Sequence, residues 1–84
     1  MTRCEVVWSD PAKAALRKLD PMVRRRIVAK VETAASNPAR FAARLVGSPY
    51  CRIRIGDWRV FVDVDEGARR LVVLDLSHRR SAYR

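Results

Sequence analysis

The stretch YCRIRIGDWR, residues 50–59, predicts a β-hairpin. In its first half, apolar residues alternate with two arginines, which is the period of a half-buried strand. Gly56 and Asp57 then predict a two-residue turn, because glycine readily takes the positive φ that such turns require. The strands that this turn joins are expected over residues 50–55 and 58–64.

A two-residue turn also fixes which side chains lie opposite each other. It pairs Ile55 with Trp58, Arg54 with Arg59, Ile53 with Val60 and Arg52 with Phe61. Three arginines and an aromatic ring then share one face of the hairpin. Like charges directly opposite each other destabilise a sheet, so we expect an anionic partner that offsets the repulsion. The alternative is a solvated polar face whose arginines extend into water.

The N-terminal half predicts a strand over residues 3–8 and two helices, the first ending near residue 19 and the second spanning residues 21–36. Each helix begins with a capping residue followed by proline. The Asn37–Pro38 step ends the second helix, because the residue before a proline disfavours helical backbone. Apolar residues at helical spacing should face the sheet: Ala12, Ala15, Leu16 and Leu19, then Val23, Ile27, Val31 and Ala34.

The C-terminal half continues with a basic connector over residues 38–49 and a turn near residues 65–68. A last strand is expected over residues 70–77, and its continuous apolar run (residues 71–74) predicts a central strand covered on both faces. The element order βααβββ gives an α+β fold, with two N-terminal helices packed on a small antiparallel sheet. Residues 1–84 are expected to form a single small domain.

Composition points to an anionic partner. The formal net charge is +9 on 84 residues, with a sequence pI near 11.0, which favours nucleic acid, an acidic protein or an anionic membrane. A GC-rich genome would also raise the arginine total, but it does not explain why arginines gather on one strand face. No apolar run is long enough for a spanning helix and the N-terminus is not a signal peptide, so we expect a cytosolic protein.

The two cysteines, Cys4 and Cys51, match no metal-binding spacing and are expected to be small core residues in a reducing compartment. They could also meet across neighbouring strands, which the sequence leaves open. The chain has no Gly-rich phosphate loop, and its scattered acidic residues do not suggest a two-metal site. We therefore expect no metal and no cofactor.

The tail HRRSAYR, residues 78–84, is a second candidate cluster. His78 can exchange a proton near neutral pH, Arg79 can bind phosphate, and Tyr83 can relay a proton or stack on a base. The ordinary alternatives are a surface histidine and a tyrosine that covers the edge of the core. Arg44 in the connector is a further candidate for RNA binding. Basic residues of the second helix are a nucleic-acid or antitoxin contact or a solvated face: Arg24, Arg25, Arg26 and Lys30.

Together these motifs resemble the RelE/ParE superfamily of type II toxin–antitoxin toxins, and more closely its RelE branch. The resemblance rests on the βαα start, the Asn37–Pro38 break, the Arg44-Leu45-x-Gly47 step, the stretch YCRIRIGDWRV and the tail HRRSAYR. It covers nearly the whole chain.

The resemblance implies a cytosolic, metal-independent endoribonuclease that cuts mRNA in the ribosomal A site and is silenced by an antitoxin, which we expect to be acidic. In such a site the ribose 2′-hydroxyl attacks the adjacent phosphate and leaves a 2′,3′-cyclic phosphate. The implied catalytic residues are Arg59, Arg79, Tyr83 and His78, and the implied RNA-binding residues are Arg52, Arg54, Arg44 and Phe61. Two alternatives remain, a ParE-like DNA gyrase inhibitor without nuclease activity and a simple nucleic-acid-binding module.

One departure from the RelE branch affects the expected chemistry. Some relatives carry lysine where this chain has Arg52 and Arg54, and a lysine can give up its proton whereas arginine stays charged. The arginines are therefore expected to bind phosphate and stabilise charge. Any proton transfer is expected from the tail, through His78 or Tyr83.

Overall fold

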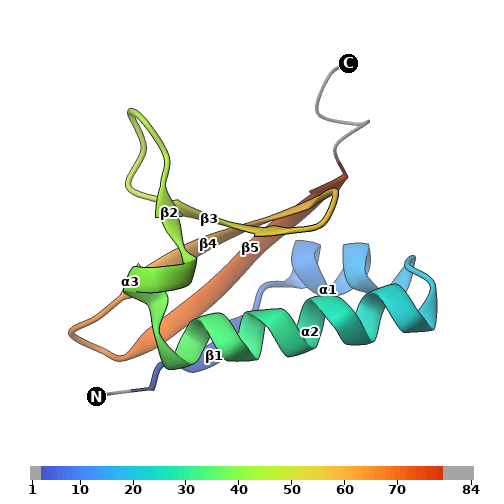
Figure 1. Ribbon diagram of the computed structural model, residues 1–84, viewed down its shortest axis with the longest axis horizontal. Helices are drawn as coiled ribbons and strands as arrows, with labels where there is room; N and C mark the ends of the chain where they lie inside the picture. The colour runs from blue at the N-terminus through green and yellow to red at the C-terminus, as the bar shows by residue number, and fades with distance from the viewer. Residues whose placement is uncertain (1–2, 79–84) are drawn as a thin grey trace.

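The fold is a five-stranded sheet with helices on one face, and the computed structural model describes residues 3–78 (Figure 1). The strand order is β1-β5-β4-β3-β2. The strands are β1 (Glu5–Trp8), β2 (Ala43–Arg44), β3 (Cys51–Ile55), β4 (Trp58–Asp65) and β5 (Arg70–His78). The helices are α1 (Asp10–Arg17), α2 (Pro21–Ser36) and α3 (Pro38–Phe41). The predicted α+β class is confirmed.

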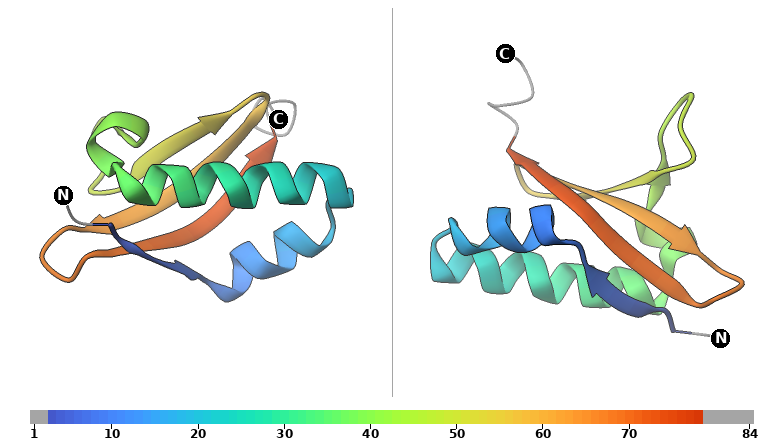
Figure 2. Two further views of the ribbon diagram at one scale, coloured as in Figure 1. Left: turned by 60° about the horizontal axis from the view of Figure 1, so that its bottom comes forward. Right: turned by 180° about the vertical axis from the view of Figure 1, so that it is seen from behind.

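Helices α1 and α2 lie side by side against the same face of the sheet (Figure 2). α1 packs on β5, and α2 packs on β1 and β3. The bounds of α2 are those that the sequence predicts, with Asp20 as the capping residue whose carboxylate accepts a 3.4 Å hydrogen bond from the Met22 amide. Among the helices of residues 3–78, none combines the length and apolar character needed to cross a membrane.

Ser9 ties the start of α1 to the central strand. Its hydroxyl accepts a hydrogen bond from the Ala12 amide (3.3 Å) and donates one to the Leu74 carbonyl (2.8 Å). Of the two capping candidates that the sequence offers, Ser9 and Asp10, Ser9 is therefore the cap: it satisfies an unpaired amide of the helix and anchors the helix to β5.

The hydrophobic core lies between the helices and the sheet. Its fully buried large side chains are Ile27, Val31, Val60, Val62, Leu71 and Val73. Ile53 and Ile55 join them from β3, as their alternation predicts. Cys4 is buried and Cys51 half-buried, and both thiols are free.

Three features differ from the sequence-based prediction. β1 pairs with β5 in parallel, so the sheet is mixed and not wholly antiparallel. The connector contains α3 and β2, which are too short for a periodic signal. β5 is central, as predicted, but it is not covered on both faces: Leu71 and Val73 are buried, whereas Val72 is half-buried.

The pairing of β4 with β5 contains one irregularity. Phe61 pairs with Asp75, but Val62 pairs with Val73, so Leu74 is an extra residue on β5. This β-bulge explains why Leu71 and Val73 on one side of it, and Leu76 on the other, can all be buried.

Candidate functional site

The turn between β3 and β4 is the two-residue turn that the sequence predicts. Gly56 takes a φ of +57°, which favours glycine. The register that results confirms all four predicted pairs, from Ile55 opposite Trp58 to Arg52 opposite Phe61. The local chemistry of the turn thus decides which side chains point away from the helices.

Three arginines gather on the face of the sheet that points away from α1 and α2, called the open face below. This arginine cluster consists of Arg52, Arg54 and Arg59, and Phe61 lies beside it. In an antiparallel ladder that begins at a two-residue turn, Arg54 and Arg59 form a non-hydrogen-bonded pair, in which facing side chains come closest. The predicted juxtaposition of like charges is therefore confirmed.

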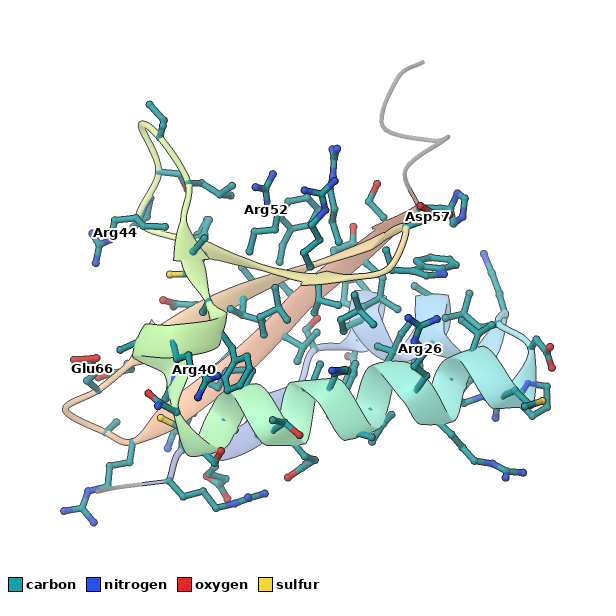
Figure 3. The ribbon with its side chains drawn as sticks, viewed as in Figure 1. Arg26, Arg40, Arg44, Arg52, Asp57 and Glu66 are labelled. Carbon is teal, nitrogen blue, oxygen red and sulfur yellow. The ribbon has the colours of Figure 1, made fainter. Side chains whose placement is uncertain are left out.

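Two arginines of the cluster, Arg52 and Arg54, form no ion pair with a carboxylate among residues 3–78. Arg54 is exposed, and Arg52 is half-buried on the side of the sheet away from α2 (Figure 3). The Nε atom of Arg52 is buried and has no hydrogen-bond partner among residues 3–78. A guanidinium held on a strand with an unused donor suits an anionic ligand with several oxygens, such as a phosphate.

Charge on the open face changes sign along β4. Beyond Phe61 the same strand carries Asp63 opposite Val72, and then Asp65 opposite Arg70. Arg70 in turn lies 3.9 Å from the carboxylate of Glu5. The cationic end of the open face is thus the end near the turn, and an anionic strand would be repelled from the opposite end.

The structure places two predicted site residues away from the cluster. Trp58 pairs with His78, so both point to the helix-facing side, and their rings meet edge to face with centroids 4.9 Å apart. Arg44 pairs with Cys51, which puts it on the face opposite to Arg52. The predicted residues Arg79 and Tyr83 lie outside the described residues.

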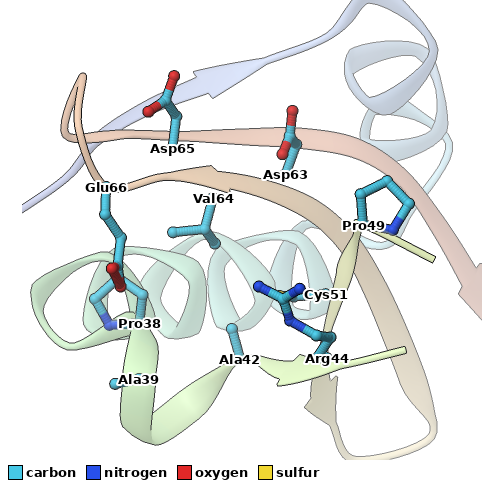
Figure 4. Close-up of a pocket in the computed structure, with 10 residues that line it drawn as sticks. All are labelled: Pro38, Ala39, Ala42, Arg44, Pro49, Cys51, Asp63, Val64, Asp65 and Glu66. Carbon is cyan, nitrogen blue, oxygen red and sulfur yellow. The ribbon is translucent and has the colours of Figure 1, made fainter. Parts of the chain in front are cut away.

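Arg44 instead borders a cleft that no sequence pattern predicted. The cleft has a volume of about 460 Å³ and lies where β4 runs past the start of β3 (Figure 4). It is lined by Pro38, Ala39, Ala42, Arg44, Pro49, Cys51, Asp63, Val64, Asp65 and Glu66. The lining includes three acidic residues and one arginine, so the cleft does not extend the arginine cluster.

The basic residues of α2 do not form one uniform surface. Arg24 donates a 3.3 Å hydrogen bond to the Leu19 carbonyl, so its side chain has a structural role at the start of α2. Arg26 lies beneath the β3–β4 turn, where its Nη2 atom would be 3.3 Å from a Cβ added at Gly56 (Figure 3). Arg26 therefore places a further positive charge near the turn, from the opposite side of the sheet.

Comparison with known families gives one match. A sequence model of the family described as "ParE toxin of type II toxin-antitoxin system, parDE" matches residues 6–83. No curated protein sequence matches this chain.

Solved structures of toxin–antitoxin proteins share the fold. A chain of the RelBE2 complex from Mycobacterium tuberculosis is 23% identical in sequence and has a TM-score of 0.84. The match covers 94% of this chain and 94% of the M. tuberculosis chain. A chain of the RelE–RelB complex from Pyrococcus horikoshii OT3 is 26% identical in sequence and has a TM-score of 0.77. The match covers 94% of this chain and 97% of the P. horikoshii chain. The isolated RelE toxin of E. coli is 20% identical, with coverages of 92% and 84% and a TM-score of 0.77.

Proposed function

The chain belongs to the family of ParE toxins of type II toxin–antitoxin systems, within the RelE/ParE superfamily, and on this premise we propose that it is a toxin that stops translation by cutting mRNA in the cytosol. The proposed reaction is ribosome-dependent endonucleolytic cleavage in the A site. The observation that carries the proposal is the arginine cluster on the open face, with donors that no carboxylate among residues 3–78 satisfies at Arg52 and Arg54.

The proposed chemistry uses phosphate binding and charge stabilisation. The ribose 2′-hydroxyl attacks the adjacent phosphorus, the bond to the 5′-oxygen of the next nucleotide breaks, and a 2′,3′-cyclic phosphate remains. Arg59 and Arg79 would hold the phosphate and the charge that develops on its oxygens. Arg52 and Arg54 would orient the message, and no metal is required.

Proton transfer is assigned in this proposal to the tail. Tyr83 would assist the proton movements or stack on a base. His78 stays a candidate, and its edge-to-face contact with Trp58 supplies a competing explanation, since the contact gives the ring a packing role. If His78 only packs, its replacement by phenylalanine will leave cleavage unchanged.

The proposal includes an antitoxin as partner. The RelB–RelE structures that share this fold are complexes of a toxin with an antitoxin. An acidic partner would reduce the self-repulsion of a chain with a net charge of +9. We therefore expect a hetero-oligomer with an acidic antitoxin, and a short acidic reading frame next to this gene.

A second candidate function is inhibition of DNA gyrase without nuclease activity. The family match to ParE toxins favours it, and the positive charge suits either activity. The arginine cluster and the tail with Arg79 and Tyr83 favour the nuclease. Inhibition of supercoiling by the purified protein would support the second candidate.

The deciding experiment measures mRNA cleavage on programmed ribosomes by purified, antitoxin-free protein. Wild type should cut and leave a cyclic phosphate end, and Arg59→Ala should lower the rate by about 100-fold or more, as the loss of a transition-state donor does. The matched control is Arg70→Ala, at the anionic end of the open face, which should change the rate by less than about twofold. Folded wild-type protein that cuts no message would overturn the proposal, as would equal losses in the two variants.

A further inference from the structure

The last residues of β4 have an unpaired edge. β3 pairs with β4 only as far as Cys51 opposite Val62, whereas β5 pairs with it as far as Arg70 opposite Asp65. On the β3 side of residues 63–65, the part of the chain that the structure describes supplies no partner strand. An unpaired strand edge is a template on which another chain can add a strand.

The amide and carbonyl of Val64 point to this unpaired side. On β5, the Val73 carbonyl accepts a 3.0 Å hydrogen bond from the Ser9 amide, so it points to β1. The backbone groups of Leu71, at the alternate position, point the same way and therefore away from Val64, its partner on β4. Leu71 and Val64 thus form a non-hydrogen-bonded pair, and the backbone groups of Val64 point outward, into the cleft that Arg44 borders.

Pro49 occupies the position where β3 would have to continue. Extending the register beyond Cys51 would put Pro49 opposite Val64, and proline has no amide to donate. Tyr50 is held in the loop instead: its amide donates a 3.1 Å hydrogen bond to the Ser48 hydroxyl, and its carbonyl accepts a 3.0 Å hydrogen bond from the amide of residue 45. No turn, loop or cap within residues 3–78 bonds to the Val64 backbone, which is therefore available to a ligand.

The cleft beside this edge has room for a short peptide and is lined mainly by acidic side chains. Its volume is about 460 Å³, within the range of ligand-binding clefts. Asp63 and Asp65 point to one side of β4 and Val64 to the other (Figure 4). The three acidic lining residues outnumber the one arginine, and none of them forms an ion pair among residues 3–78. A cationic ligand is therefore favoured at this end of a strongly basic chain.

We propose that this edge and cleft bind an extended peptide of a partner protein, in which arginine or lysine alternates with small apolar residues. The peptide would add to β4 as a further strand and exchange hydrogen bonds with the amide and carbonyl of Val64. Its residue opposite Val64 would point to the helix-facing side, and the basic residues that flank it would lie opposite Asp63 and Asp65. Strand addition of this kind takes its affinity from main-chain hydrogen bonds and its specificity from alternate side chains.

The charge of the cleft distinguishes this partner from the acidic antitoxin and from the message. Asp63 and Asp65 would repel both an acidic segment and RNA phosphates. The cleft lies at the end of β4 away from the β3–β4 turn, so the peptide would not cover Arg54 and Arg59 of the arginine cluster. The inference therefore goes beyond the proposed nuclease function and does not depend on it.

The test measures the affinity of a fluorescein-labelled peptide of alternating arginine and valine by fluorescence anisotropy at low salt. Wild type should bind it. Methylation of the backbone nitrogens of the valines keeps the charge and removes the amides that would pair with Val64, so it should weaken binding by about fivefold or more. Equal binding of the methylated peptide would overturn strand addition, because charge alone would then explain the affinity.

A pair of double variants tests the two aspartates. Asp63→Asn combined with Asp65→Asn should weaken binding of the peptide by about fivefold, because two cross-strand charge pairs are lost. The matched control is Asp57→Asn combined with Asp75→Asn, which changes the net charge equally but at the other end of β4, where Asp75 lies opposite Phe61. The control should change the affinity by less than about twofold. Equal losses in the two double variants would overturn the site.

Hydrogen exchange gives a second readout that needs no variant. The Val64 amide should exchange quickly in the free protein and be protected about tenfold when the free peptide is at about ten times its Kd. The Val62 amide, already paired with Cys51, should change far less. A Val64 amide that stays unprotected, or wild-type protein that does not bind the peptide, would overturn the inference, whereas the nuclease function is tested separately by mRNA cleavage.

Discussion

The two faces of the sheet are made of alternate residues of the same strands, yet their side chains have opposite environments. The helix-facing side carries apolar residues that are almost completely buried, among them Val60, Val62 and Val73. The open face carries the arginine cluster, where like charges lie opposite each other at Arg54 and Arg59. Burial of apolar side chains on the helix-facing side therefore stabilises the fold. Repulsion between arginines on the open face destabilises it, but leaves a surface that can bind an anion.

The largest difference between the faces should be measurable at two neighbouring valines of β5. Val73 is fully buried in the core, whereas Val72 is half-buried on the open face. Val73→Ala should lower the free energy of unfolding by about 2 kcal/mol, because it removes packed methyl groups and leaves a cavity. Val72→Ala should cost about 0.5 kcal/mol or less. Urea unfolding of both variants, compared at equal slope, measures the difference.

Equal losses of unfolding free energy in the two variants would contradict the difference between the two faces. They would mean that the open face is packed in solution as tightly as the helix-facing side. A loss that is larger for Val72 would mean that the assignment of faces on β5 is reversed.

The turn that sets the two faces should give an intermediate effect. Gly56 has a φ of +57°, a conformation that costs other residues about 1 kcal/mol, so Gly56→Ala should destabilise the protein by about that amount. Gly67, in the turn between β4 and β5, is the matched control. A Cβ added there would lie 3.5 Å from the Asp65 carboxylate, an ordinary contact, and Gly67→Ala should be nearly neutral.

A double variant separates strain from crowding at this turn. The atom that a new Cβ at Gly56 would approach is the far end of the flexible Arg26 side chain, which can move away. Arg26→Ala should therefore not rescue Gly56→Ala in urea unfolding. A rescue would show that contact with Arg26, and not the backbone conformation, sets the cost.

Local signals allowed several parts of the fold to be predicted from the sequence. The register of the hairpin follows from two residues, Gly56 and Asp57, because a two-residue turn leaves no freedom in the pairing. The bounds of α2 follow from an aspartate and a proline at one end and an Asn–Pro step at the other. In each case the deciding interactions lie within a few residues of each other.

The parts that were missed depend on contacts between distant segments. Counting alternate residues from Leu71 would put His78 on the open face, and only the bulge at Leu74 turns it towards Trp58. Arg44 lies in a two-residue strand, whose pairing with Cys51 has no periodic signal. The parallel pairing of β1 with β5 likewise depends on the path of the chain through both helices.

The smallest predicted effect tests whether the open face carries an electrostatic cost. Arg54→Gln removes one of two facing charges, so it should raise the free energy of unfolding by about 0.2–1 kcal/mol at low salt. The gain should vanish near 1 M salt, where the Debye length falls to about 3 Å. Unfolding in urea at both salt concentrations is the measurement.

Removing any arginine also lowers the net charge, so the comparison needs a control that has the same effect on net charge. Arg25→Gln supplies it, because Arg25 is exposed on α2 and its helical neighbours at positions 21, 22, 28 and 29 carry no charge. If the repulsion between Arg54 and Arg59 is real, Arg54→Gln will stabilise the protein more than Arg25→Gln at low salt, and equally at high salt. Equal gains at low salt would mean that the facing arginines do not repel each other measurably, and the argument from repulsion to an anionic partner would lose its basis.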